Sequence, residues 1–165
     1  MTGPRSPVLI EGWASLFGVP DAEGDVVRAG AFSAALQRAG AGRVAMLLSH
    51  ADGDVAGRWT RIEERGRGLF VRGLIDPETP AGQAALMLME GGRLDGLSIG
   101  FVARRYRPRM GRAGRDLLDI DLREVSLVTT PMLSGARFHA PGVPLSVAHS
   151  GVPGRMFSRP HRVAA

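Results

Sequence analysis

Residues 92–129 read GRLDGLSIGFVARRYRPRMGRAGRDLLDIDLREVSLVT. Two runs rich in β-branched and aliphatic residues, 97–106 and 116–129, lie on either side of a segment rich in arginine, proline and glycine. Apolar runs of this length that end at turn residues are typical of strands, and proline and glycine favour a connecting turn. We therefore expect a long hairpin, with the arginines of 104–115 at its tip.

The remainder of the first 130 residues carries similar signals. Four further runs predict strands: VLIEGWASLF (8–17), RVAMLLSH (43–50), VAGRWTRIEE (55–64) and GLFVRGLI (68–75). Two segments predict helices, 31–40 and 79–92, and the second has Thr79 as its cap and Pro80 in its first turn. Strands joined mainly by turns disfavour a doubly wound parallel sheet. The expected fold class is mixed α/β, mainly β, with a barrel or a strongly curved sheet.

The composition excludes several classes of protein. A chain of 165 residues fits one domain with a real core. It contains no cysteine, so disulfides, thiolate catalysis and cysteine-bound zinc are excluded. No run approaches the roughly 20 apolar residues of a membrane span, and the first residues lack the apolar segment of a signal peptide. We expect a soluble protein that is not exported and has no membrane partner.

The net charge of +5 is concentrated near the C-terminus, where residues 132–165 contain four arginines and no acid. Proline, glycine and serine interrupt every period from residue 139 onward, which predicts a flexible basic tail over 139–165 behind a domain of residues 1–138. Nucleic-acid binding would call for aromatic residues among the arginines of 104–115, and only Tyr106 is there. We therefore favour contact with an acidic partner surface over direct nucleic-acid binding.

Strand alternation places two polar side chains on apolar stripes. His50 follows the even-numbered apolar residues of 43–50, so we expect it at a partly buried rim. Glu124 falls where the even-numbered positions of 116–129 are mostly aliphatic. A buried carboxylate must find a partner or take up a proton. An edge strand or a salt bridge to Arg123 is the structural alternative for Glu124, and a purely structural role is the alternative for His50.

Ser98 lies between Gly96 and Gly100 on a face with few side chains, which would leave room for an extended substrate backbone. A serine, a histidine and a carboxylate are the parts of a nucleophile activated by a general base. We therefore take Ser98, His50 and Glu124 as candidate catalytic residues. The alternative for Ser98 is simple packing between two glycines.

Two other motifs are weaker. Residues 96–100 match the G-x-S-x-G nucleophile elbow, but the elbow needs a helix after the serine, and 99–106 continue as a strand, which disfavours a small esterase. The acids Asp21, Glu23 and Asp25 lack the later bidentate glutamate of a calcium loop. We expect no metal and no cofactor.

Four blocks in order resemble the prohead (procapsid maturation) protease family of tailed phages, prophages and gene transfer agents: EGWASLFGVPDAEGDVVRAGAF, MLLSHADGDVAGRW, GRLDGLSIGF and DLREVSLVTTPM. The resemblance covers about residues 8–138. It implies a serine endopeptidase whose fold is similar to the herpesvirus assemblins, a herpesvirus-protease-like β-barrel flanked by a few helices. It assigns His50 as the histidine, Ser98 as the nucleophile and Glu124 as the acidic third member of the triad.

The resemblance also implies substrates and surroundings. These are the scaffold and the N-terminal segment of the major capsid protein, cut inside the assembling procapsid in the host cytoplasm, together with self-cleavage in the tail of 139–165. By analogy with assemblins, main-chain amides around Thr130, Met132 and Leu133 would bind the oxyanion, and two copies would pair as a homodimer. A catalytically silent capsid-assembly protein, binding capsid or scaffold through 104–115 and the tail, is the alternative function.

Overall fold

The structure, a computed structural model, describes residues 5–141. Both predicted helices are present, and each of the six predicted runs contains a strand. The elements in chain order are β1 (Val8–Leu16), β2 (Val26–Val27), α1 (Ser33–Ala39), η1 (Ala41–Arg43), β3 (Ala45–Leu47), β4 (Val55–Arg65), β5 (Gly68–Ile75), α2 (Pro80–Glu90), β6 (Gly96–Pro108), β7 (Arg115–Val128) and β8 (Phe138–His139). The mainly β prediction is confirmed. The expected tail lies largely outside the described residues.

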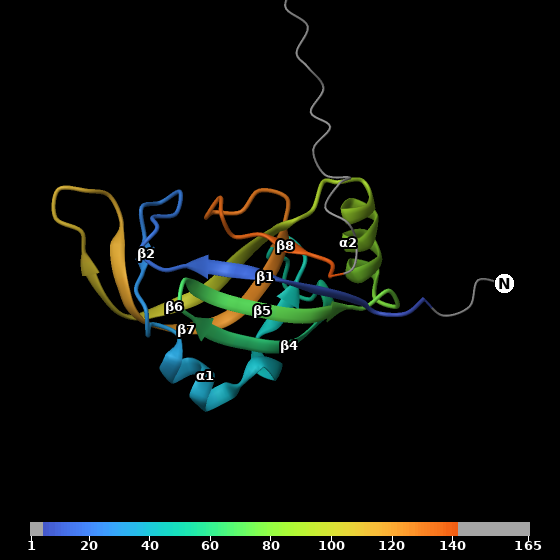
Figure 1. The fold of residues 1–165 in the computed structure, drawn as a ribbon, viewed down its shortest axis with the longest axis horizontal. Helices are drawn as coiled ribbons and strands as arrows, with labels where there is room; N and C mark the ends of the chain where they lie inside the picture. The colour runs from blue at the N-terminus through green and yellow to red at the C-terminus, as the bar shows by residue number, and fades with distance from the viewer. Residues whose placement is uncertain (1–4, 142–165) are drawn as a thin grey trace, which may run out of the picture.

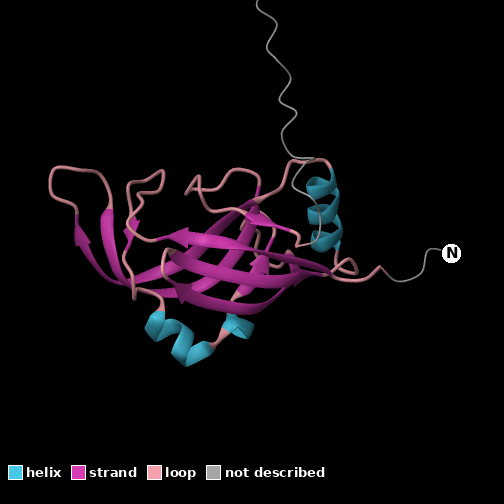
Figure 2. Ribbon diagram, in the orientation of Figure 1, coloured by secondary structure: helices cyan, strands magenta, loops and turns pink. Residues whose placement is uncertain are grey.

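The strands form one twisted sheet, with α1 and α2 at its periphery (Figures 1 and 2). Neighbouring strands follow the order β2-β7-β3-β4-β5-β1-β8, and β6 pairs with β7. The strands β4, β5 and β1 pair antiparallel, whereas β7 pairs in parallel with both β2 and β3. The strand β7 is therefore the element that joins the N-terminal segments to the C-terminal half of the domain.

The sheet does not close into a complete barrel. Its ends meet where Gly96 and Arg137 form an isolated bridge, at which the Leu97 N–H donates to the Ala136 carbonyl at 2.9 Å and the Phe138 N–H donates to the Asp95 carbonyl at 2.8 Å. Residues 129–137 are irregular, and β8 is only two residues long. A continuous ladder of hydrogen bonds therefore cannot join β6 to β1, and the curved sheet stays open along this seam.

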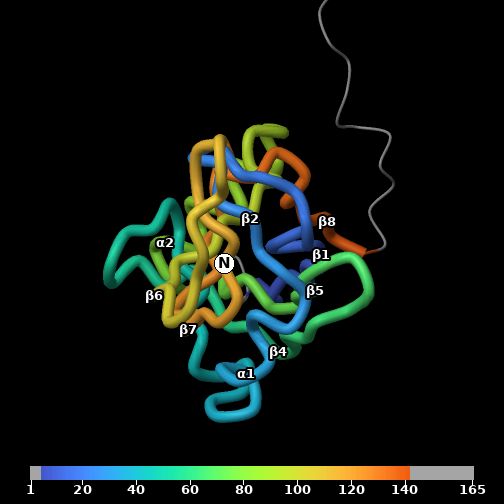
Figure 3. The backbone as a smooth tube through the Cα atoms, turned by 90° about the vertical axis from the view of Figure 1, so that its left-hand side faces the viewer, coloured from blue at the N-terminus to red at the C-terminus, as the bar shows by residue number. Residues whose placement is uncertain are grey.

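The predicted hairpin is formed by β6 and β7, which project from the body of the domain (Figures 1 and 3). The two strands extend so far that only residues 109–114 form the tip. Several of its arginines are paired with acids: Arg104 lies 2.8 Å from Asp121, and Arg115 lies 2.5 Å from Asp25. The first ion pair joins β6 to β7 within the hairpin, and the second joins the hairpin to the segment before β2.

Local sequence explains α2 well. The hydroxyl of Thr79 accepts the N–H of Gly82 at 3.0 Å, as expected of an N-cap, and Pro80 occupies the first turn. The helix buries Ala85 and Leu86 and packs mainly against β4. No helix among residues 5–141 has the length and apolar character needed to cross a membrane.

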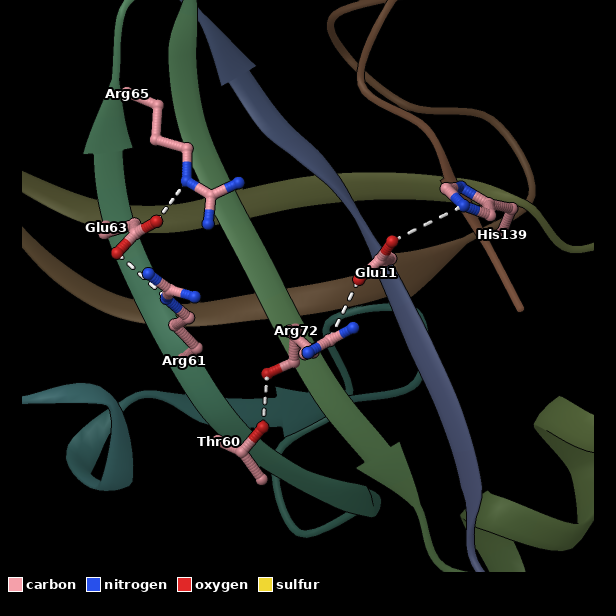
Figure 4. Close-up of polar contacts among 7 residues, drawn as sticks. All are labelled: Glu11, Thr60, Arg61, Glu63, Arg65, Arg72 and His139. Atoms are coloured by element: carbon pink, nitrogen blue, oxygen red, sulfur yellow. Dashed lines mark hydrogen bonds and ion pairs between the residues drawn. The ribbon is translucent and has the colours of Figure 1, made fainter. Parts of the chain in front are cut away.

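The outer face of β1, β4 and β5 carries ion pairs (Figure 4). Arg72 donates to Glu11 at 2.9 Å, and His139 lies 3.7 Å from the same carboxylate. On β4, Glu63 accepts from both Arg61 and Arg65. Pairs of this kind in contact with water contribute little to stability, so the fold depends on the buried inner face of the sheet.

Candidate active site

His50 lies on a tight turn after β3. Both Ser49 (φ 54°) and His50 (φ 60°) have left-handed backbone conformations, which residues other than glycine rarely adopt. The Ser49 N–H donates to the Leu127 carbonyl at 2.9 Å, which fixes the turn against β7. The strand ends at Leu47, so the alternation argument does not extend to His50, and the turn directs its ring instead. Such backbone outliers are concentrated at functional sites.

Glu124 owes its position to a register shift in β7. Gly100 pairs with Glu124, but the next residue of β6 pairs with Leu122, which leaves Arg123 as an extra residue in β7. Side chains switch faces at this point, because Leu122 and Val125 are both in the core. Strand alternation predicted that Glu124 would occupy a position on the aliphatic face. Because of the register shift, it does not. Its side chain is 14 % exposed.

His50 and Glu124 are in direct contact. The Nδ1 atom of the imidazole bonds to Oε1 of the carboxylate, and the histidine side chain is 42 % exposed. None of the residues 5–141 bonds to the other ring nitrogen, Nε2. One nitrogen held by an anion and the other available for a proton is the arrangement required of a general base beside a serine.

Ser98 lies on the neighbouring strand, directly opposite Ser126 and diagonal to Glu124. Opposite and diagonal side chains of antiparallel strands lie about 5–8 Å apart. Ser98 is 5 % exposed, and it lines a cleft of about 300 Å³ together with His50. None of the described residues forms a hydrogen bond with its Oγ. The fold thus brings Ser98, His50 and Glu124 to one site, with the serine hydroxyl not yet bonded to the imidazole.

Gly96 and Gly100, two positions to either side of Ser98, lie close to residues of β7 and of the loop after it. A Cβ atom at Gly100 would lie 2.7 Å from Oε1 of Glu124, and one at Gly96 would lie 2.9 Å from Cδ of Pro131. Both positions need glycine because these neighbours occupy the space. A role in admitting substrate is not needed to explain the two glycines and stays a prediction.

The three residues predicted to bind the oxyanion differ in their position relative to the cleft. Met132 and Leu133 line the cleft, whereas Thr130 is exposed and does not. The Met132 carbonyl accepts the N–H of Ala22 at 2.9 Å, which ties this loop to the segment after β1. Which amides bind an oxyanion stays a prediction.

Four charged residues of the cleft wall were not predicted: Asp21, Glu23, Asp25 and Arg115. One carboxylate oxygen of Asp21 accepts the N–H groups of Glu23 and Asp25, each at 2.9 Å. The Arg115 guanidinium bonds to Asp25 and holds the pKa of that carboxyl below its ordinary value, while the same bond raises the pKa of Arg115. Sequence gave no signal for this pair, since its members are 90 positions apart. The described residues include no cluster of His, Cys, Asp or Glu side chains suited to a metal ion.

Two alternatives for the site residues are also decided by the structure. Ser98 does not lie on a nucleophile elbow, because β6 continues through Pro108 instead of turning into a helix. Arg123 forms an ion pair with Asp121, with Nη2 and Oδ2 2.8 Å apart, so it is not the partner of Glu124. The carboxylate of Glu124 therefore faces His50 and not a structural salt bridge.

Known proteins resemble this chain in sequence and in fold. The prohead protease of Enterobacteria phage HK97 is 33 % identical over 132 residues, which are 79 % of this chain and 58 % of that protein. Two herpesvirus structures have a similar fold, KSHV protease in complex with a hexapeptide phosphonate inhibitor and varicella-zoster virus protease. They are 14 % and 15 % identical to this chain, and each comparison gives a TM-score of 0.53 and covers 81 % of this chain and 64 % of the other. Residues 4–143 match the caudovirus prohead serine protease family, and the chain belongs to that family.

Proposed function

We propose that the chain is a serine endopeptidase of procapsid maturation, in which Ser98 is the nucleophile, His50 the general base and Glu124 the carboxylate that orients it. The observation that carries the proposal is the contact between Glu124 and Nδ1 of His50, which lines the same cleft as Ser98. Family membership supports cleavage of peptide bonds. The chain spans 58 % of the length of its HK97 relative, so the activity is proposed for these residues on their own chemistry.

The mechanism follows from the two ring nitrogens of His50. Nε2 takes the proton of Ser98 Oγ as that oxygen attacks the carbonyl carbon of the substrate. The imidazolium, stabilised by Glu124, then gives this proton to the leaving amine as the C–N bond breaks. A water molecule, activated by the same nitrogen, hydrolyses the acyl ester and restores Ser98. Catalytic hydrogen bonds often tighten only when substrate binds, which is consistent with the unbonded Oγ.

The tetrahedral oxyanion requires preorganised donors. We assign this role to main-chain N–H groups around Thr130, Met132 and Leu133. Of these residues, Met132 and Leu133 line the cleft and Thr130 is exposed. The proposed substrates are the scaffold and the N-terminal segment of the major capsid protein, cut inside the assembling procapsid. Self-cleavage and pairing of two copies belong to the same proposal.

The test is co-expression of the full chain with the capsid protein precursor encoded beside it. Wild-type protein should shorten the precursor, and Ser98→Ala should abolish the shortening. Ser33→Ala is a matched control, because Ser33 lies on α1 and does not line the cleft. Shortening that survives Ser98→Ala would exclude Ser98 as the nucleophile. If the wild type copurifies with an uncut precursor, the chain is a catalytically silent assembly protein.

A further inference from the structure

The carboxylate of Glu124 has a second hydrogen-bond donor besides His50. Ser126 Oγ donates to Oε1 at 3.2 Å, and this is the same oxygen that contacts His50 Nδ1. Ser126 is completely buried. It follows Glu124 by two positions in β7, so both side chains lie on one face of the strand. A buried hydroxyl aimed at a carboxylate stabilises the charged form and restricts its rotation.

Gly100 completes the environment of Glu124 from the neighbouring strand. It pairs with Glu124 across the ladder, and a Cβ atom there would lie 2.7 Å from Oε1 and 2.8 Å from Cδ. The carboxylate therefore lies across the bare backbone of β6. Any larger residue would push it out of this space, away from Ser126 and toward the exposed side of the site.

We propose that Ser126 and Gly100 are positioning residues that hold the carboxylate of Glu124 against His50. The inference rests on the proposed function and assigns these two residues to the same site. Neither touches the reacting atoms. Because the His50 ring is 42 % exposed and lies on a turn, its orientation depends on a carboxylate that is itself fixed. Ser126 lies opposite Ser98, so the carboxylate is fixed beside the nucleophile.

No other described group is placed to do this. Arg123 adjoins Glu124 but forms its ion pair with Asp121, at 2.8 Å. The other charged groups around the site do not form ion pairs with either His50 or Glu124. They are Asp52 and Asp54 on the turn that follows His50, and Asp21, Glu23, Asp25 and Arg115 on the cleft wall. Among residues 5–141, His50 and Ser126 are the hydrogen-bond partners of the Glu124 carboxylate.

The kinetic test compares Ser126→Ala and Ser126→Cys with wild type, using a peptide that spans a cleavage site of the capsid precursor. Cysteine nearly keeps the volume of serine but is a weak donor. Both variants should lower kcat about 10-fold with little change in KM, as expected when one hydrogen bond to a charged group is lost. The control is Ser33→Ala, which removes a similar bond from Ser33 Oγ to Glu64 at 2.8 Å, far along the chain from the site. Its kcat should stay at the wild-type value.

A second measurement does not depend on activity. In the inactive Ser98→Ala background, the proton NMR signal of His50 Nδ1–H should be visible as a strongly hydrogen-bonded resonance. Adding Ser126→Ala should broaden or shift it, and adding Ser33→Ala should not. If folded Ser126→Ala keeps both the signal and the wild-type kcat, the positioning role is overturned. If Ser98→Ala still cleaves while the signal responds to Ser126→Ala, the proposed function fails and the positioning role stands.

Discussion

The sheet holds two histidine–glutamate pairs whose surroundings differ. On the outer face, His139 lies 3.7 Å from Glu11, and Glu11 also accepts from Arg72 at 2.9 Å (Figure 4). Glu124 instead contacts His50, which lines the cleft, and accepts from the neutral hydroxyl of Ser126. The charge of Glu11 is thus already balanced by a permanent cation, whereas the charge of Glu124 remains available to stabilise an imidazolium.

The two pairs also differ in how far their side chains are exposed to solvent. The side chains of His139 and Glu11 are 50 % and 22 % exposed, and they lie on a face open to water, where such pairs contribute little. Glu124 is 14 % exposed, next to a buried serine on the neighbouring strand. A histidine–carboxylate pair therefore becomes a candidate catalytic base only where the fold adds a nucleophile and excludes competing cations.

The largest expected effect distinguishes the two histidines. His50→Ala should reduce cleavage of the capsid precursor by about 10³-fold or more, because it removes the proposed base. His139→Ala removes an exposed ring and should leave the rate unchanged. Initial rates on one precursor peptide give the measurement. Equal losses in both variants would contradict the assignment of His50.

Substitution of Glu124 should lower kcat, whereas substitution of Glu11 should not. Glu124→Gln keeps the shape of the side chain but removes the charge that orients and stabilises the imidazolium, so kcat should fall between about 10- and 10⁴-fold. Glu11→Gln alters the pairs with Arg72 and His139 on the outer face and should leave kcat unchanged. Thermal melting of both variants shows whether they remain folded. An unchanged rate in folded Glu124→Gln would remove Glu124 from the mechanism.

A smaller effect is expected from Gly100→Ala. The added methyl group would meet Glu124 at the position where the carboxylate crosses β6. We expect a loss of about 1–3 kcal/mol in the free energy of unfolding from overpacking, together with a drop in kcat of about 10-fold as the carboxylate shifts. Gly66→Ala is the control, since a Cβ atom there meets nothing within 4 Å. A fully active Gly100→Ala would show that Glu124 tolerates displacement.

Sequence reasoning found the strands and both helices because their signals are local. Thr79 and Pro80 predict the start of α2 without reference to the remainder of the chain. The alternation used to select Ser98 is also present in β6, since Leu97 is fully buried on one face of the strand and its neighbours point the other way; the catalytic role of Ser98 stays a prediction. Period and capping are properties of neighbouring residues, so one sequence suffices to detect them.

The features that were missed depend on pairing between distant segments. The register shift at Arg123 reverses the faces of β7, and alternation within one strand cannot reveal it. The left-handed turn at Ser49 and His50 is stabilised by Leu127, far along the chain. The sheet stays open for a similar reason, because the irregular loop 129–137 lies where β6 would have to pair with β1. The three predicted site residues do lie at one site, but part of the reasoning that selected them does not hold.

The smallest expected effects concern stability and again contrast the cleft with the outer face. Arg115 lowers the pKa of Asp25 in the cleft wall, and Arg65, with Arg61, lowers the pKa of Glu63 on β4. A carboxyl whose folded pKa is depressed stabilises the fold above its unfolded pKa, which is about 3.9 for aspartate, and this contribution is lost as the pH falls through the folded value.

Asp25 is 5 % exposed, so Asp25→Asn should lower the free energy of unfolding by about 2 kcal/mol at pH 6, because it leaves Arg115 without its partner. The difference from wild type should begin to shrink below about pH 4, where the carboxyl of the unfolded wild-type chain takes up a proton, and it should be lost as the pH falls through the lower pKa of the folded state. Glu63→Gln, on the solvent side of the sheet, should not change the free energy of unfolding measurably at either pH. Urea unfolding of the three proteins at pH 6 and pH 3 provides the comparison. A larger loss for Glu63→Gln than for Asp25→Asn would mean that the outer face, and not the cleft wall, supplies the electrostatic stability of the domain.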